Sequence, residues 1–233
     1  MDPPSEPESA KGTTASDRAA EGRSETTGAR PVMTTGRLEA FSDGVFAIAA
    51  TLLILSVHAT GSSLGPAVLH AWPSYAGYAV SFLSIGVMWV NHHVVMHQIA
   101  RVDRRLLMIN IVFLMLVAFV PFPTQLLAEH LGGPGARVAA LTYGVTLMLT
   151  AVLYNLLWLY ASIGRRLLEE SADPVTVRGI TRSYIVGPWV YLAATLVAFA
   201  SPIASAVLYA VIAASYMVES TVFGRRRGMR TRG

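Results

Sequence analysis

The sequence predicts an all-α fold: a polytopic membrane protein with six transmembrane helices per subunit and both termini in the cytoplasm. Of its 233 residues, 53% are hydrophobic and only 14% are charged, whereas a soluble domain carries about a quarter charged residues. Apolar stretches of about 20 residues, the length that crosses a bilayer, recur along the chain. Basic residues cluster in alternate connections between these stretches, as they do in multi-pass membrane proteins.

The first 35 residues differ in composition from the rest of the chain. They contain almost no large apolar side chain and carry charges of both signs, so they cannot bury enough surface to offset the entropy of ordering. We therefore expect a disordered cytoplasmic tail over 1–35, and no signal peptide, because an apolar core segment is missing. The six-helix membrane domain is expected over 36–223 and a basic cytoplasmic tail over 224–233.

Six stretches are apolar and long enough to be helices that span the membrane. They are 38–58, 72–98, 106–128, 138–163, 183–200 and 203–222. Turn-forming residues separate several of them: GSSLGP follows the first, GGPG follows the third, and SP precedes the sixth. Pro73 and Pro202 suit the first turn of the second and sixth helices, where the missing N–H costs nothing.

The distribution of basic residues sets the orientation. Every Lys and Arg except Arg137 falls at the N-terminal side, in the second or fourth connection, or in the C-terminal segment. Because positive residues are retained in the cytoplasm, we predict a multi-pass protein of the cell membrane with both termini cytoplasmic. The net charge of +4 thus reflects topology, and we expect no nucleic-acid partner. The absence of cysteine excludes disulfides and thiol catalysis.

Three charged residues, Arg37, Glu39 and Asp43, stand at the start of the first apolar stretch. The uncharged part of this stretch runs only from 44 to 60, so a span of about 20 residues must include Asp43. A carboxylate within the membrane costs at least about 2.5 kcal/mol unless it is paired or hydrated. Asp43 therefore needs a polar partner from another helix.

The end of the second predicted helix offers such a partner, because it holds a polar cluster at a similar depth. The cluster consists of Trp89, Asn91, His92, His93 and His97. We expect Ser42 and Asp43 to hydrogen-bond across to it. The contact can serve as a structural clasp or as a proton or ion relay, and the sequence leaves both open.

Beyond Asp43, the first helix carries an apolar stripe. Ile48, Leu52 and Leu55 recur at spacings of four and three, with Thr51 at the edge. A stripe of this kind most often faces lipid or a neighbouring helix, so the spacing alone assigns it no function.

Two short motifs resemble the signatures of a known channel family. The first is R-x-x-x-F-S-D, formed by Arg37, Phe41, Ser42 and Asp43, and the second is W-x-N-H-H, formed by Trp89, Asn91, His92 and His93. Together with the six predicted spans, they make residues 36–222 similar to prokaryotic members of the lysosomal-type potassium channel family (transmembrane protein 175). We interpret the residues of both motifs as the family's structural network.

The resemblance implies a potassium-permeable cation channel assembled from four copies of the chain, with the pore lined by the first helix of each. Carried over by distance from the FSD motif, the pore and selectivity positions are Ile48, Thr51, Leu52 and Leu55. It also implies a hydrophobic constriction with modest preference for K⁺ over Na⁺. The partners would be other copies of the chain, the lipid bilayer and monovalent cations, with K⁺ permeant and no cofactor. A TVGYG filter is missing, and TYGV at 142–145 falls within the fourth predicted helix.

Other classes compete with this interpretation. HHxxxH at 92–97 resembles the His boxes of membrane di-iron enzymes, but such sites need several boxes, and His58, His70 and His130 lie near the opposite face. We therefore expect no metal centre, no catalytic residue and no enzymatic activity. A secondary transporter or proton-coupled carrier stays an alternative, although the two halves show no repeat and Pro188 is the only clear mid-span interruption. A signalling or structural membrane protein also stays open.

Overall fold

Residues 34–58 and 63–230 are described by a computed structural model of the chain, with side chains described up to Met217. They are predominantly helical, which confirms the predicted all-α class. The predicted tail over 1–35 lies almost wholly outside the described residues. Helix α9 runs to Arg230, so most of the segment 224–233 that the sequence assigns to a tail continues this helix.

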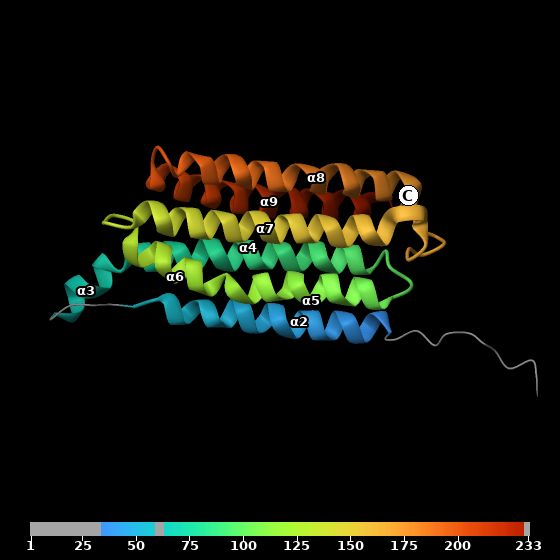
Figure 1. Ribbon diagram of the computed structural model, residues 1–233, viewed down its shortest axis with the longest axis horizontal. Helices are drawn as coiled ribbons and strands as arrows, with labels where there is room; N and C mark the ends of the chain where they lie inside the picture. The colour runs from blue at the N-terminus through green and yellow to red at the C-terminus, as the bar shows by residue number, and fades with distance from the viewer. Residues whose placement is uncertain (1–33, 59–62, 231–233) are drawn as a thin grey trace, which may run out of the picture. The chain divides into compact units, whose positions relative to one another are not determined.

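Long helices lie side by side and run in alternating directions (Figure 1). They are α2 (Thr35–Leu52) with its 3-10 extension η1 (Leu53–Ser56), α4 (Trp72–Met96), α5 (Arg104–Phe119) with α6 (Pro121–His130), α7 (Ala136–Ser162), α8 (Pro174–Val197) and α9 (Pro202–Arg230). The short helices in the connections are α3 (Leu64–His70) and η2 (Ile163–Arg165). Helix α2 packs against α4 and α5, and α7 packs against α5, α8 and α9.

Among the described residues, four helical segments are long and apolar enough by themselves to cross a membrane. They are Thr35–Ser56, Trp72–Met96, Arg104–His130 and Ala136–Arg165. Helix α8 does not reach this standard, and α9 counts only as a shorter apolar helix over Pro202–Met217. The membrane-protein class therefore has direct support, whereas the count of six spans stays a prediction.

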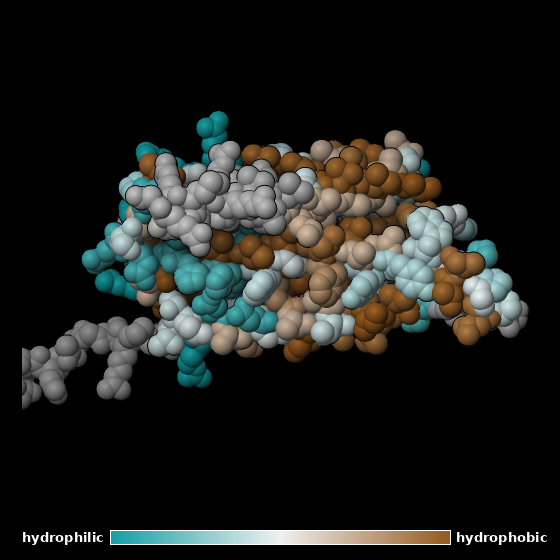
Figure 2. Space-filling view, turned by 180° about the vertical axis from the view of Figure 1, so that it is seen from behind, coloured by the Kyte–Doolittle hydropathy of each residue, from teal (hydrophilic) through white to brown (hydrophobic). Residues whose placement is uncertain are grey.

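The start of α2 and the end of α9 lie at the same end of the bundle (Figure 1). The α4–α5 and α7–α8 connections lie there too. We call this the basic end, and its basic residues include Arg37, Arg101, Arg104, Arg165 and Arg166. Seen from behind (Figure 2), hydrophilic side chains gather at the basic end and apolar ones cover much of the middle. Which end faces the cytoplasm stays a prediction.

Every long helix exposes large apolar side chains. Met115 on α5 is 61% exposed, Trp189 on α8 is 68% exposed, and Val211 on α9 is 57% exposed. In water each Å² of such surface would cost about 25 cal/mol, a penalty that lipid or another apolar protein surface removes. Exposure on this scale is typical of a protein that is covered by lipid or by another apolar surface.

The third span expected from the sequence, 106–128, is divided into two helices. Helix α5 ends at Phe119 and α6 begins at Pro121, with Val120 between them. Two prolines, Pro121 and Pro123, cannot donate an N–H bond to the preceding turn, so the α-helical ladder is interrupted there. The uninterrupted helix expected at this place was wrong, although both parts still form one continuous apolar crossing.

Helix α8 begins at Pro174, well before the boundary at 183 that hydrophobicity alone suggested. Asp173 sets this start, because its carboxylate accepts hydrogen bonds from the backbone N–H groups of Val175 (3.1 Å) and Thr176 (3.0 Å). These bonds satisfy donors that an uncapped helix would leave free, and they hold the pKa of Asp173 below its ordinary value. The sequence interpretation had placed this first polar stretch of α8 in the connection.

Helices α7, α8 and α9 approach closely at Gly144, inside the TYGV segment that the sequence places within a helix. A Cβ at this position would collide with the hydroxyl groups of Tyr209 and Thr195. The Tyr209 hydroxyl instead donates to the carbonyl of Ala140 at 3.2 Å. Only glycine leaves room for this contact.

At the basic end the α4–α5 and α7–α8 connections are hydrogen-bonded to each other. The Ala100 N–H donates to the carbonyl of Leu167 (2.9 Å), and the Glu169 N–H donates to the carbonyl of Gln98 (2.9 Å). Between them, Ile99 and Leu168 form an isolated antiparallel bridge. The last turn of α4 is therefore held next to the connection that follows α7.

Asp103 strengthens this tie between connections. Its carboxylate caps α5 by accepting from the Leu106 N–H (2.8 Å), accepts from the Tyr160 hydroxyl (2.6 Å), and lies 3.8 Å from Arg166. Partial burial acts to raise the pKa of Asp103, but these hydrogen bonds and the Arg166 charge outweigh it and hold the pKa below its ordinary value.

Candidate functional site

Helix α2 has two faces of opposite character. Its inner face is buried against α4 and α5 through Leu38, Ser42, Phe46 and Ala49, and Leu53 of η1 continues this face with 0% exposure. Because the buried positions recur at spacings of three and four, they form one continuous stripe. Within the described part of the chain, the side chains on the opposite face are exposed.

The residues predicted to face the pore lie on this opposite face. Ile48 is 61% exposed, Leu52 is 42% exposed, and Leu55 is 64% exposed. Thr51 is exposed beside them, and its hydroxyl donates to the carbonyl of Ile48 at 2.9 Å. We call Ile48, Thr51, Leu52 and Leu55 the outer stripe. Its last member stands on η1, where the helix tightens, so the predicted α-helical spacing ends at Leu52.

Asp43 has a polar partner on another helix, as the sequence predicted. Its Oδ1 accepts a hydrogen bond from Nε1 of Trp89 at 2.9 Å, which joins α2 to α4 near the basic end. Trp89 is 41% exposed in the single chain. The pair therefore lies at the surface of the chain, where other molecules can also reach it.

Ser42 belongs to a separate, buried set of hydrogen bonds. Its hydroxyl donates to the carbonyl of Leu38 (2.9 Å) and accepts from Nδ2 of Asn110 on α5 (3.0 Å). The Oδ1 of Asn110 lies 2.9 Å from Nε2 of His92 on α4. Since Asn110 accepts through Oδ1, His92 donates through Nε2, and the neutral Nε2–H tautomer completes the set. Asn110 thus links three helices.

Asn110 was missed by the sequence interpretation. The signal was present, because a single amide stands between Ile109 and Ile111 within an apolar helix, where an unpaired polar group is costly. Its partners, however, lie on two other helices, and spacing within α5 does not identify them. The expected contact between Ser42 and the second helix is therefore indirect and passes through Asn110.

The His92 ring is packed between aromatic side chains. It stacks on Phe113 with 5.8 Å between ring centroids and 2° between planes, and Phe46 lies at 5.4 Å. His92 is 0% exposed, and its Nδ1 is the one buried side-chain polar atom without a hydrogen-bond partner among the described residues. This environment favours a fixed structural role for the ring.

His93 turns to the other side of α4 and meets Glu39 of α2. Its Nδ1 lies 2.7 Å from Oε1 of Glu39, and its Nε2 lies 3.1 Å from Nε2 of His97. Glu39 and His93 were both noted in the sequence, but their pairing was not predicted.

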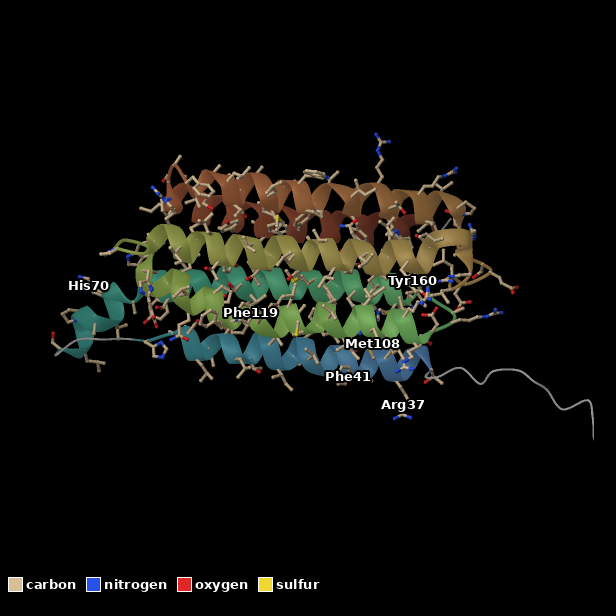
Figure 3. All side chains as sticks on the ribbon, viewed as in Figure 1. Arg37, Phe41, His70, Met108, Phe119 and Tyr160 are labelled. Carbon is tan, nitrogen blue, oxygen red and sulfur yellow. The ribbon has the colours of Figure 1, made fainter. Side chains whose placement is uncertain are left out.

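The remaining motif residues are not brought into these contacts. Figure 3 shows Arg37 pointing away from the bundle, and Phe41 is 56% exposed. Neither side chain forms a hydrogen bond or an ion pair with a described residue. Asn91 takes part only through its carbonyl, which accepts from the Tyr154 hydroxyl at 2.6 Å.

Four apolar helical segments long enough to cross a membrane, together with the large exposed apolar side chains, define a multi-pass membrane protein. Residues 37–121 match the family described as endosomal/lysosomal potassium channel TMEM175. The chain belongs to the TMEM175 family, which confirms the resemblance seen in its two motifs. This is a family of ion channels and not of enzymes.

The chain covers most of the length of two bacterial relatives. A protein from Chamaesiphon minutus named as a potassium channel is 48% identical over 173 residues, which are 72% of this chain and 85% of that one. A protein from Streptomyces collinus with the same description is 43% identical over 172 residues, covering 72% and 84%. The crystal structure of a lysosomal potassium-selective channel TMEM175 homologue from Chamaesiphon minutus superposes with a TM-score of 0.73 at 43% identity, over 80% of this chain and 97% of that one.

Proposed function

We propose that the protein is a homotetrameric, potassium-permeable cation channel of the cell membrane, whose pore is lined by α2. The observation that carries the proposal is the outer stripe, because Ile48 and Leu55 are more than half exposed while the opposite face of the same helix is fully packed. Relatives named as potassium channels support the choice of ion.

Four copies of the outer stripe around one axis would form rings of branched apolar side chains. Such a ring is narrow and poorly wetted, which is a recognised means of limiting ion flow. An ion that passes must shed part of its hydration shell, and this costs K⁺ less than the smaller Na⁺. Thr51 hydroxyls or helix carbonyls can replace some of the lost water. The expected preference for K⁺ is therefore modest.

The structural role proposed for the polar contacts of α2 follows from the helices that they join. The link from Ser42 through Asn110 to His92 and the bond from Trp89 to Asp43 join α2 to α4 and α5. A helix that lines a pore must keep a fixed orientation about its own axis. Because successive residues are about 100° apart around that axis, a rotation of this size would turn the outer stripe away from the pore and bring other residues into its place. We assign these contacts to holding that rotation.

The test is bilayer recording of the purified protein under opposing K⁺ and Na⁺ gradients. Leu52→Ala should widen the ring and ease wetting, so conductance rises and the reversal potential moves toward loss of K⁺ preference. The matched control is Leu196→Ala, because Leu196 is 55% exposed on α8, away from the outer stripe. It should leave conductance and selectivity unchanged.

Leu53→Ala provides a second comparison. Leu53 follows Leu52 directly but is fully buried, so its truncation should lower stability by about 2–5 kcal/mol and leave the permeation of assembled channels unchanged. Equal effects of Leu52→Ala and Leu196→Ala on permeation would contradict a pore lined by α2. Flux that saturates with substrate, without single-channel currents, would indicate the transporter alternative.

A further inference from the structure

A cluster of three metal-ligating side chains lies at the basic end and takes no part in the proposed pore. It consists of Glu39, His93 and His97, whose ligand atoms all lie within 4.8 Å of one another. His93 and His97 are four residues apart at the end of α4, so their rings extend from the same helical face. Both are exposed, and Glu39 is intermediate. The cluster is therefore accessible from solution in the single chain.

Glu39 determines which nitrogen of His93 is available. Its Oε1 lies 2.7 Å from Nδ1 of His93, so the proton of the neutral ring is held on Nδ1. The lone pair is then left on Nε2, which lies 3.1 Å from Nε2 of His97. A carboxylate that accepts from one ring nitrogen while the other faces outward is the usual arrangement around metal-binding histidines.

We propose that His93 and His97 bind one divalent transition-metal ion, such as Zn²⁺ or Ni²⁺, through their Nε2 atoms, and that Glu39 orients His93. Imidazole nitrogens are preferred ligands of these ions. With about 2.0–2.1 Å from zinc to each nitrogen, the 3.1 Å separation gives an N–Zn–N angle of roughly 100°, close to tetrahedral. Water completes the coordination, because both rings are exposed.

This site differs from the di-iron centre considered from the sequence. That centre would need ligands from several His boxes, and His58, His70 and His130 do not supply them. A single-ion site needs only the two rings of His93 and His97, and the structure adds Glu39 from another helix. Metal binding would strengthen the existing contact between α2 and α4, because the orienting carboxylate and the ligands stand on different helices.

The experiment is isothermal titration of Zn²⁺, and separately Ni²⁺, into the purified full chain in detergent, carrying no polyhistidine tag. We expect one ion per chain, accompanied by a rise in the thermal unfolding temperature, since a ligand that binds only the folded state stabilises it. His97→Ala should remove binding at concentrations that saturate the unsubstituted protein. Glu39→Gln should retain the ligands but weaken binding about 10–100-fold, as expected for loss of an orienting carboxylate.

His130→Ala is the matched control, because His130 belongs to α6 at the opposite end and its ring contacts the carbonyl of Leu126. It should bind the ion like the unsubstituted chain. His97 is exposed, so its replacement is expected to leave the fold intact, and circular dichroism checks this for each variant. Absence of binding by the unsubstituted chain, or unchanged binding after His97→Ala, would overturn the site. Because binding is measured without ion flux, the result does not depend on the channel proposal.

Discussion

Asn110 is a single polar side chain in an apolar helix that links this helix to two others by hydrogen bonds. Its amide uses both ends, donating to Ser42 and accepting from His92, and it is 0% exposed. By contrast, the bond from Trp89 to Asp43 lies at the surface, where water can replace either partner. Burial therefore makes the Asn110 contacts the more consequential of the two.

We expect Asn110→Ala to destabilise the protein by about 1–3 kcal/mol, because it leaves the buried Nε2 of His92 without a partner and removes the bond that the Ser42 hydroxyl accepts. The measurement is the thermal unfolding temperature in detergent, together with the yield of assembled protein. Asn91→Ala is the matched control, since Asn91 belongs to the W-x-N-H-H motif but contributes only its backbone carbonyl. Equal losses from the two substitutions would contradict a specific stabilising role of the Asn110 hydrogen bonds.

At the scale of helices, close approach depends on small residues as much as on apolar ones. Because Gly144 of α7 has no Cβ, the hydroxyl groups of Tyr209 on α9 and Thr195 on α8 can lie against its backbone. Tyr209 is 1% exposed and Thr195 is 4% exposed, so neither side chain can move into open space. A larger residue at 144 must therefore separate helices.

Gly144→Ala should lower the free energy of unfolding by about 1–3 kcal/mol through overpacking, despite the better helix propensity of alanine. Gly86→Ala on α4 serves as the comparison, because nothing lies within 4 Å of a Cβ at that position. There the gain in propensity, about 1 kcal/mol, should appear without a steric cost. The measurement is the thermal unfolding temperature of both variants. A Gly144→Ala protein as stable as the unsubstituted chain would show that α7, α8 and α9 are less tightly packed than described.

At the scale of the whole molecule, the orientation of the bundle in the membrane can be measured by labelling one cysteine introduced at either end. The chain contains no cysteine, so a single introduced thiol reports one position. Ser63→Cys, next to α3, should react with a membrane-impermeant reagent added outside cells, and Ser171→Cys, between α7 and α8, should not. Both serines are exposed. Labelling of the second alone would reverse the predicted orientation and place the basic end outside.

The sequence predicted the elements that depend on local patterns. Proline in the first turn of α4 and of α9 follows from its missing N–H, and the need of Asp43 for a partner follows from the cost of a buried charge. Contacts between helices were harder to foresee. The position of Asn110 in the network depends on how α2, α4 and α5 are rotated against each other, which spacing within one helix does not determine.

The same limit explains the misplaced boundaries and the missed pairing of Glu39 with His93. A capping carboxylate and a proline pair decided where α8 and α6 begin, in segments whose hydrophobicity suggested otherwise. Glu39 and His93 lie far apart in the chain, and only the packing of α2 on α4 brings them together. The hydrophobicity of a segment indicates whether it lies in the membrane, but it does not identify which polar side chains of two different helices meet.

The bridge between Ile99 and Leu168 has a consequence for how the chain is made. Because a ribosome adds residues from the N-terminus, α4, α5 and α6 exist before the strand-like partner of Gln98 and Ala100 has been synthesised. During that interval the backbone groups of this connection must bond to water. They exchange water for protein only after α7 has crossed and returned the chain to the basic end. Closure of this bridge therefore cannot precede the synthesis of α7, although its first partner follows directly after α4.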